Sequence, residues 1–378
     1  MSKRLPVTVI TGFLGAGKTT LLRELLQTSG QRLAVMVNEV GSVGLDGDLI
    51  RSCGFCPEDE LEGRLVELNN GCLCCTVQDD FLPTMERLLE RADNLDGIVV
   101  ETSGLALPRP LLQALEWPDI RSKVHVNGVV TVVDGQALAG GSPVADPEAL
   151  EQQRRDDPSL DHLTAIDELF EDQLQAADLV LMSRADCVSE AALLGVCDQL
   201  KTDTRAGTPI LPMRNGHIDP QIVLGLEHRH DHADHDHSHD HDHSHDHDHS
   251  HDHDHDHHDH THVEIKGSVI RLEGRVVRAA LEQALKALVG PHQVVRLKGR
   301  VWFPDKTLPL QIQMVGPRLD SWFEAAPPTA WRPQSGGGVD LVVLGFSELL
   351  SEAMSRDLHK LVSATPDTPK APAATSNA

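Results

Sequence analysis

Between Leu5 and about Leu226, short apolar runs alternate with stretches in which apolar residues recur at helical spacing. This alternation is typical of a parallel sheet covered by helices, with ligands bound at the carboxyl ends of the strands. Thr20–Gln27 is expected to form the first helix. The expected strands are Val7–Thr11, Leu33–Val37, Gly97–Val100, Val129–Val133, Asp178–Met182 and Pro209–Met213.

A second globular pattern begins at Val263. Its periodicity predicts an α+β module of about 90 residues in which strands and helices are mixed. The expected strands are Val263–Leu272, Gln293–Phe303, Leu308–Val315 and Val339–Phe346, and the expected helices are Arg275–Val289 and a segment near Ser347–Val362. The tail Ser363–Ala378 is rich in Pro, Ala, Ser and Thr and is expected to be unstructured.

The stretch His228–His262 separates the two globular patterns and holds eighteen histidines and eleven aspartates with almost nothing apolar. Such a composition cannot bury a core, so disorder is expected. Neutral imidazoles on a flexible chain chelate Co²⁺, Zn²⁺ or Ni²⁺ in many combinations, which favours a poorly selective metal store. The alternative is a solvated spacer whose composition is incidental.

Composition narrows the class of protein. A chain of 378 residues that is 40% hydrophobic is long enough for two ordinary domains. The net charge of −25 argues against a nucleic-acid or anionic-membrane partner. No apolar run of membrane-spanning length and no signal-peptide pattern occur. Seven cysteines, an odd number in tight clusters, fit reduced thiols and metal ligation, so a cytoplasmic location is expected.

The segment Gly12–Thr19 fits the pattern G-x-x-x-x-G-K-[ST] between an expected strand and an expected helix. Glycines let successive backbone N–H groups point at an anion, and the helix N-terminus adds partial positive charge. Lys18 would reach the β- and γ-phosphates, and the Thr19 hydroxyl would hold Mg²⁺. A nucleotide hydrolase is therefore predicted. The residues expected to contact the nucleotide here are Gly12, Gly15, Ala16, Gly17, Lys18, Thr19 and Thr20.

Acidic residues follow two of the expected strands. Glu101 ends an apolar strand, where it would help to hold Mg²⁺ or order the attacking water, and the backbone N–H at Gly104 would meet the γ-phosphate. Glu39 and Asp46 lie in a glycine-punctuated loop after the second strand. They would reach Mg²⁺, the attacking water or a second metal, or else face solvent.

The stretch Ser183-Arg184-Ala185-Asp186 follows a later strand. Guanine presents adjacent N1–H and N2–H donors, and the Asp186 carboxylate can accept both. Ser183 can add a hydrogen bond. This pattern predicts the base-binding part of a GTP site.

The cysteines offer a thiolate site. Cys53-x₂-Cys56 is followed, after fifteen residues, by Cys72-Leu73-Cys74-Cys75. The spacing through Cys72 and Cys75 matches a four-thiolate zinc site, but Cys74 adds a ligand that a closed site does not need. Three readings stay open: an exchangeable, nucleotide-responsive site for Zn²⁺ or Co²⁺, a structural zinc, or inert thiols.

The phosphate loop with Thr20-Leu21-Leu22, Asn38-Glu39-x-Gly41, Gly71–Cys75, Glu101–Gly104 and Thr131–Asp134 together resemble the CobW family of metal-handling P-loop GTPases. Arg296–Gly299 and Leu341–Gly345 resemble that family's second domain. The Cys53/Cys56 pair and the histidine-rich insert are most similar to the subgroup named for cobalamin biosynthesis. The family's guanine motif is usually Asn-Lys-x-Asp, so Ser183-Arg184 departs from it. The Arg184 stem would lie over the base as Lys does.

The resemblance implies an α/β fold, a P-loop NTPase domain with a mainly parallel sheet followed by a smaller α+β C-terminal domain. The expected division is 1–226 for the GTPase domain, 227–262 for a disordered His/Asp-rich metal-binding linker, 263–350 for the C-terminal domain and 351–378 for a helix end and disordered tail.

The function implied is a metallochaperone that captures a divalent metal with GTP bound and releases it on hydrolysis. Co²⁺ for cobalamin biosynthesis is the favoured cargo, and a zinc-transfer GTPase or a passive His-rich metal store is the alternative. The metal ligands implied are Cys72, Cys74 and Cys75, with Glu39 as a further candidate. The implied partners are an acceptor protein, such as a cobalt chelatase or a zinc enzyme, and a second copy of the chain.

Overall fold

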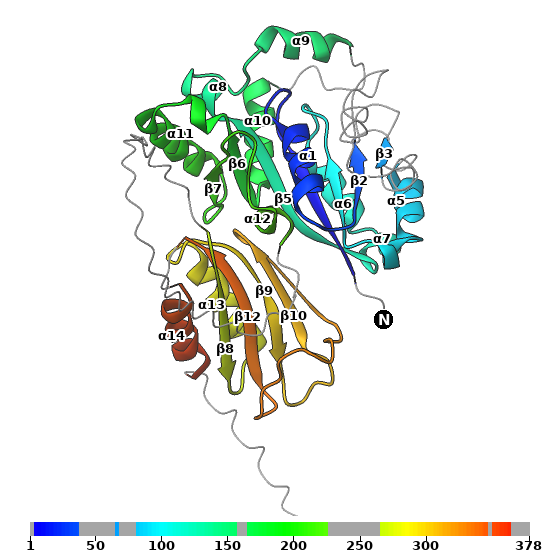
Figure 1. The fold of residues 1–378 in the computed structure, drawn as a ribbon, viewed down its shortest axis with the longest axis vertical. Coiled ribbons are helices and arrows are strands. Elements are labelled where there is room, and N and C mark those ends of the chain that lie inside the picture. Colours follow the sequence, from blue (N-terminus) through cyan, green and yellow to red (C-terminus); the bar gives the residue numbers. More distant parts are fainter. Residues whose placement is uncertain are drawn as a thin grey trace, which may run out of the picture.

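The computed structural model describes residues 4–37, 65–67, 81–156, 165–225, 265–346 and 350–363. Two sheets organise these residues, one parallel with seven strands and one antiparallel with five. Figure 1 shows the parallel sheet with its helices in the upper half of the view and the antiparallel sheet below it. The predicted fold class, a P-loop α/β domain followed by a smaller α+β domain, is confirmed.

The parallel sheet has the strand order β3-β2-β4-β1-β5-β6-β7. Its strands are β1 (Leu5–Thr11), β2 (Leu33–Val37), β3 (Leu65–Glu67), β4 (Gly97–Glu101), β5 (Val124–Asp134), β6 (Leu179–Ser183) and β7 (Ile210–Pro212). The direction of connection reverses at β1, because β2, β3 and β4 lie on one side of it and β5, β6 and β7 lie on the other. In open parallel sheets ligands bind in the crevice at the carboxyl ends of the strands beside such a reversal.

Helices cover both faces of this sheet. They are α1 (Lys18–Thr28), α5 (Leu82–Leu89), η2 (Ala92–Asn94), α6 (Pro108–Leu115), α7 (Pro118–Arg121), α8 (Gly135–Ala139), α9 (Pro147–Asp156), α10 (Ile166–Ala176), η3 (Ala185–Cys187), α11 (Glu190–Asp203) and α12 (Pro220–Leu224). Successive strand residues point to opposite faces, so Val7 and Val9 pack with α5 and α6 whereas Ile10 packs with α1. All three are completely buried, which gives roughly 1.5–3 kcal/mol each.

The antiparallel sheet has the order β11-β10-β9-β12-β8, and all its pairs are antiparallel. Its elements are β8 (Lys266–Glu273), α13 (Arg278–Val289), β9 (Val294–Trp302), β10 (Leu310–Val315), β11 (Arg318–Phe323), β12 (Gly338–Gly345) and α14 (Leu350–Ser363). Apolar residues of α13 and α14 pack on one face, which includes Leu297 and Val301 of β9. The alternate residues Arg296, Lys298 and Arg300 therefore belong to the opposite, polar face.

Buried polar contacts join the two sheets. The Arg296 guanidinium of β9 donates to the carbonyl oxygens of Ile222 and Val223 at the end of α12, at 2.6 and 2.7 Å. It also donates to Asn127 of β5 at both the side-chain and main-chain oxygens. Elsewhere Asp178, completely buried, pairs with Arg318 of β11 and with Arg205 of its own domain. The two domains are thus joined by charge-assisted hydrogen bonds as well as by apolar contact.

Three strands differ most from the sequence prediction. Strand β5 begins at Val124 rather than Val129, because His125 and Asn127 interrupt the apolar run while their side chains bond to the second domain and to β1. Strand β11 was not predicted, since polar residues make up half of it and no apolar run results. Strand β3 was missed because three residues are too few to show a period.

Within the described residues, no helix is both long enough and apolar enough to cross a bilayer.

Candidate nucleotide site

The phosphate loop, Gly12–Thr19, connects β1 to α1 at the carboxyl edge of the parallel sheet. Gly12, Gly15 and Gly17 all have positive φ angles, of 135°, 75° and 103°. At Gly12 a side chain is excluded by space as well, because a Cβ there would lie 2.1 Å from the Val132 carbonyl oxygen. The backbone therefore curls as an anion-binding loop requires, and α1 begins immediately after it.

Lys18 lies inside the loop. Its side chain is buried, and Nζ donates to the carbonyl oxygen of Phe13 at 3.1 Å. Phe13 is itself fixed, because its ring stacks on Phe170 of α10 with centroids 5.6 Å apart. The lysine charge is thus held at the loop, where a bound phosphate would lie.

Thr19 and Glu101 meet across the sheet. Strand β4 pairs with β1, and Thr19 Oγ1 donates to Glu101 Oε1 at 2.9 Å. Glu101 is 2% exposed. Next to it, the Thr102 hydroxyl donates to that of Thr11 at 2.9 Å. The two side chains that the sequence predicted as Mg²⁺-binding lie together at the start of α1.

Four strands end side by side at this point. Glu101 is the register partner of both Ile10 and Val37, and Val37 is also the partner of Glu67 in β3. We call Ile10, Glu101, Val37 and Glu67 the strand-end row. Adjacent strands are about 4.8 Å apart, so the row spans roughly 15 Å.

Gly104 packs directly against the phosphate loop. A Cβ at Gly104 would lie 2.5 Å from the Leu14 backbone nitrogen, so only glycine fits here. The Gly104 carbonyl accepts from the buried amide of Gln173 at 3.1 Å, which ties the segment to α10. The structure therefore places the Gly104 backbone beside the loop, and the contact of its N–H with the γ-phosphate stays a prediction.

The predicted base-binding residues lie on the other side of the loop. Ser183, at the end of β6, donates to the Val133 carbonyl at 3.2 Å, and a Cβ on Gly17 would lie 3.5 Å from its Cβ. Arg184 has a left-handed backbone, with φ of 51°. Asp186 is exposed in the short helix η3. The nucleotide residues predicted from the sequence thus surround one edge of the sheet.

The guanidinium of Arg184 forms contacts that the sequence did not reveal. It pairs with the Asp134 carboxylate, and Nη2 donates to the Gly15 carbonyl of the phosphate loop at 3.1 Å. Asp134 is 2% exposed and also accepts from the backbone N–H groups of Gln136 and Ala137 at the start of α8. The signal was an acid followed by glycine at a strand end, which predicts a helix cap but not an arginine partner.

The remaining predicted residues lie outside the described residues. These are Glu39, Asp46, Cys53, Cys56, Cys72, Cys74, Cys75 and the linker 227–262. Among the residues that the structure does describe, no three His, Cys, Asp or Glu side chains gather into a metal site. The two described cysteines, Cys187 and Cys197, have free thiols.

The loop geometry, Lys18, and the Thr19–Glu101 pair define a P-loop nucleotide-binding protein. Residues 6–212 match the family model described as CobW/HypB/UreG, nucleotide-binding domain, and residues 265–362 match the cobalamin synthesis protein cobW C-terminal domain. The chain belongs to the CobW/HypB/UreG family, and the resemblance seen in the sequence is confirmed.

Two full-length relatives are named zinc chaperone CobW. The protein of Sinorhizobium sp is 42% identical over 362 residues, which cover 95% of this chain and 98% of the relative. The protein of Pseudomonas aeruginosa is 44% identical over 358 residues, covering 94% and 91%. The zinc-regulated GTPase metalloprotein activator 1 of Schizosaccharomyces pombe is 36% identical over 192 residues, covering 50% and 41%. These names agree with the zinc alternative and give the favoured cargo, cobalt, no support.

Proposed function

We propose that this chain is a GTP-hydrolysing metallochaperone that captures Zn²⁺ at its cysteine motif with GTP bound and releases it to an acceptor after hydrolysis. The observation that carries the proposal is the Thr19–Glu101 pair, in which Glu101 belongs to the strand-end row. This pair links the phosphate loop to β4. Strand β4 lies beside β2, and β2 lies beside β3, the strand that precedes the cysteine motif in the sequence.

The chain direction supports coupling between nucleotide and metal. Because β2 and β3 are parallel to β4, the segments that follow Val37 and Glu67 leave the sheet at the edge where Glu101 lies. Glu39 is two residues beyond Val37, and Cys72 is five residues beyond Glu67. The segments that carry Glu39 and Cys72 therefore begin at strand ends beside Glu101. A change at the phosphate would therefore act on the start of both.

The oxygen atoms at Thr19 and Glu101 fit Mg²⁺. The cation takes six oxygen ligands at about 2.1 Å, which places adjacent ligands roughly 3 Å apart, and the observed separation is 2.9 Å. When bound, Mg²⁺ would neutralise charge on the β- and γ-phosphates. Glu101 would orient the attacking water, Lys18 would hold the γ-phosphate, and the Gly104 N–H would contact it.

Zinc is favoured by both the relatives and the donor chemistry. Three thiolates within Cys72–Cys75 are soft ligands that suit Zn²⁺, and divalent zinc ranks above cobalt in intrinsic affinity. The His/Asp linker is assigned to weak, multi-site buffering, and the acceptor to a zinc enzyme. Zinc as cargo and Mg²⁺ at Thr19 would be two separate metals on one nucleotide-bound protein.

The test of the metal site is Cys74→Ser in the full chain, with Cys197→Ser as the matched control, since Cys197 is a free thiol in α11. Zinc competition against a chromogenic chelator should show loss of the tight site in Cys74→Ser and its retention in the control. A deletion of residues 228–262 should lower the zinc stoichiometry while sparing the tight site. If Cys74→Ser retains tight zinc, the cysteine motif is not the cargo site. If only the deletion removes zinc, the chain is a passive store.

A further inference from the structure

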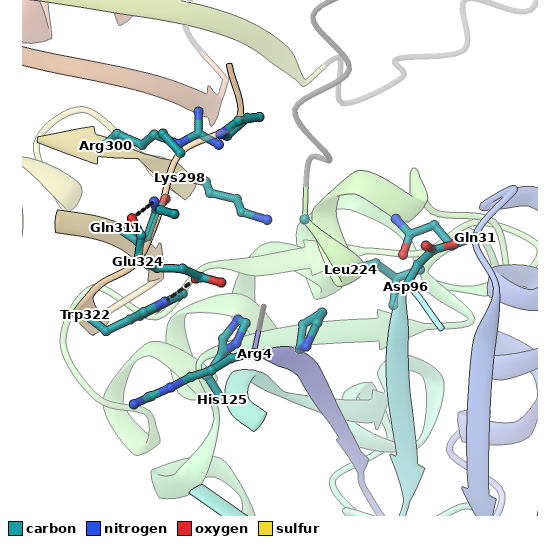
Figure 2. Close-up of a pocket in the computed structure, with 15 residues that line it drawn as sticks. Arg4, Gln31, Asp96, His125, Leu224, Lys298, Arg300, Gln311, Trp322 and Glu324 are labelled. Carbon is teal, nitrogen blue, oxygen red and sulfur yellow. Dashed lines mark hydrogen bonds between the residues drawn. The ribbon is translucent and has the colours of Figure 1, made fainter. Parts of the chain in front are cut away.

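A cavity of about 530 Å³ lies between the two domains, at the edge of the parallel sheet opposite to the nucleotide site. Figure 2 shows Arg300, Lys298, Gln311 and Trp322 of the antiparallel sheet, with Glu324 just after β11, on one side, and Gln31, Asp96 and Leu224 on the other. The volume is in the range of small-molecule sites. Because both domains form its walls, an occupant would touch both.

Arg300 forms part of the wall, and two of its three guanidinium nitrogens are enclosed by the protein. It is 6% exposed, and its Nε and Nη1 have no hydrogen-bond partner among the described residues. Burial lowers the pKa of this guanidinium, and the carboxylates of Asp340 and Glu324 counteract the effect. Arginine stays charged in proteins, so the cavity wall carries a buried cation that is only partly hydrogen-bonded within the described part of the chain.

The charges around the cavity are positive on balance. Arg4 and Lys298 line it with Arg300, and Figure 2 shows the Lys298 side chain pointing into the space between the domains. Of the two lining carboxylates, Asp96 already accepts a two-bond contact from Arg32, at 2.8 and 3.1 Å. Glu324 accepts from Trp322 Nε1 at 2.7 Å. The carboxylates therefore have donors, whereas Nε and Nη1 of Arg300 have no acceptor among the residues that the structure describes.

The rest of the wall is largely apolar, which suits an organic molecule rather than a bare ion. Ala325, Ala326 and Pro327 line it with Pro6 and Leu224, beside the Trp322 ring. One part of that ring is occupied by His125, whose ring centroid lies 4.6 Å away. A ligand with an anionic end and a small apolar end matches these surfaces.

We propose that this cavity binds a small organic oxyanion, a carboxylate or a phosphate, with Arg300 and Lys298 as its charge partners. The site is separate from the nucleotide and zinc sites and does not rest on their assignment. A cationic side chain suits both kinds of oxyanion, because each carries its negative charge on acceptor oxygens, and Nη2 is the Arg300 nitrogen that is not enclosed. The competing explanation is a cross-strand pairing of Arg300 with Asp340, its register partner. Asp340 Oδ1 accepts from Arg271, and Oδ2 is buried without a hydrogen-bond partner among the described residues.

The experiment is calorimetric titration of the full chain, saturated with GDP and Mg²⁺ so that the phosphate loop is filled. The probes are succinate and glycerol 3-phosphate, with glycerol as the neutral control. We expect one molecule of at least one oxyanion per chain and no glycerol binding. Lys298→Gln and Arg300→Gln should each weaken binding at least about tenfold, since each loses a charge-assisted bond. Lys306→Gln, an exposed lysine of the same domain, should leave it unchanged.

The two probes identify the source: binding of succinate alone assigns a carboxylate ligand, and binding of glycerol 3-phosphate alone assigns a phosphate. Lys298→Gln keeps the test decisive if Arg300→Gln does not fold, because Lys298 is only half-buried. Absence of binding by both probes to the folded wild-type chain would overturn the proposal. Binding that is unchanged in both Lys298→Gln and Arg300→Gln would also overturn it. If Arg300→Gln loses stability and no oxyanion binds, the role of Arg300 is to pair with Asp340.

Discussion

Arg296 provides a measurable link between the two domains. Its side chain is fully buried and donates four hydrogen bonds, two to the last turn of α12 and two to Asn127. The last carbonyls of a helix lack intrahelical partners, so this arginine acts as the C-terminal cap of α12. Asn127 completes the cap by donating to the Leu224 carbonyl at 3.0 Å. Burial lowers the pKa of Arg296 to about 9, which leaves it charged at neutral pH.

The magnitude follows from these bonds. Replacing Arg296 with Met fills much of the volume but leaves the carbonyl oxygens of Ile222 and Val223 buried without these donors. Bonds from charged donors contribute roughly 1.5–3 kcal/mol each and are not additive, so we expect a loss of about 3–5 kcal/mol. That is a large share of the roughly 5–15 kcal/mol that stabilise a typical folded protein.

The assay is urea unfolding of Arg296→Met, followed by far-UV circular dichroism and by tryptophan fluorescence. Three of the four tryptophans lie in the second domain, so fluorescence reports mainly on that domain. We expect an earlier midpoint and a separation of the two signals, because the domains lose their coupling. Lys306→Met, an exposed lysine in the second domain, is the matched control. A loss below about 1 kcal/mol with coincident transitions would refute the argument, since the guanidinium would then contribute little.

Three further outcomes are expected. Gly12→Ala should abolish binding of a fluorescent GTP analogue, because its methyl group would overlap a backbone carbonyl, while Gly195→Ala, which meets nothing within 4 Å, should bind normally. Glu101→Gln should lower the rate of phosphate release at least about 100-fold and leave nucleotide bound, and an unchanged rate would remove Glu101 from catalysis. The Glu273 carboxylate accepts a hydrogen bond from the backbone N–H of Gln334, and this bond lowers the pKa of Glu273. The ionised carboxylate therefore stabilises the folded protein above its ordinary pKa, and this stabilisation is lost as the pH falls through the lowered pKa. Thermal unfolding of Glu273→Gln should therefore differ from wild type at neutral pH and converge with it in acid, and a constant difference would contradict this.

The sequence predicted the parallel sheet well because its strands are short apolar runs bounded by glycine and polar loops. Leu33–Val37 was placed without error, and β1, β4 and β6 agree within two residues at each end. Periodicity could not define β11, where Arg318 and Asp320 turn polar side chains toward the domain interface. When the inner face of a strand is also polar, the strand lacks the alternation of apolar and polar residues on which the prediction depends.

Contacts between residues distant in sequence could not be predicted. Motif spacing placed Lys18, Thr19 and Glu101 in one site, because strand, loop and helix follow a fixed order. Nothing local indicated that Arg296 caps a helix 74 residues earlier, or that Arg184 bonds to Gly15. Such pairs depend on how two domains or two loops pack together, and local patterns in a single sequence do not predict that packing.

The central claim is that the phosphate state of the nucleotide sets zinc affinity through the strand-end row. It is tested most directly by measuring the zinc dissociation constant of the full chain, by chelator competition, with Mg²⁺ and either a non-hydrolysable GTP analogue or GDP. The account predicts that zinc binds at least about tenfold more tightly in the GTP-analogue state, and by linkage that zinc tightens the analogue by the same factor. Equal zinc affinity in the two states would contradict it.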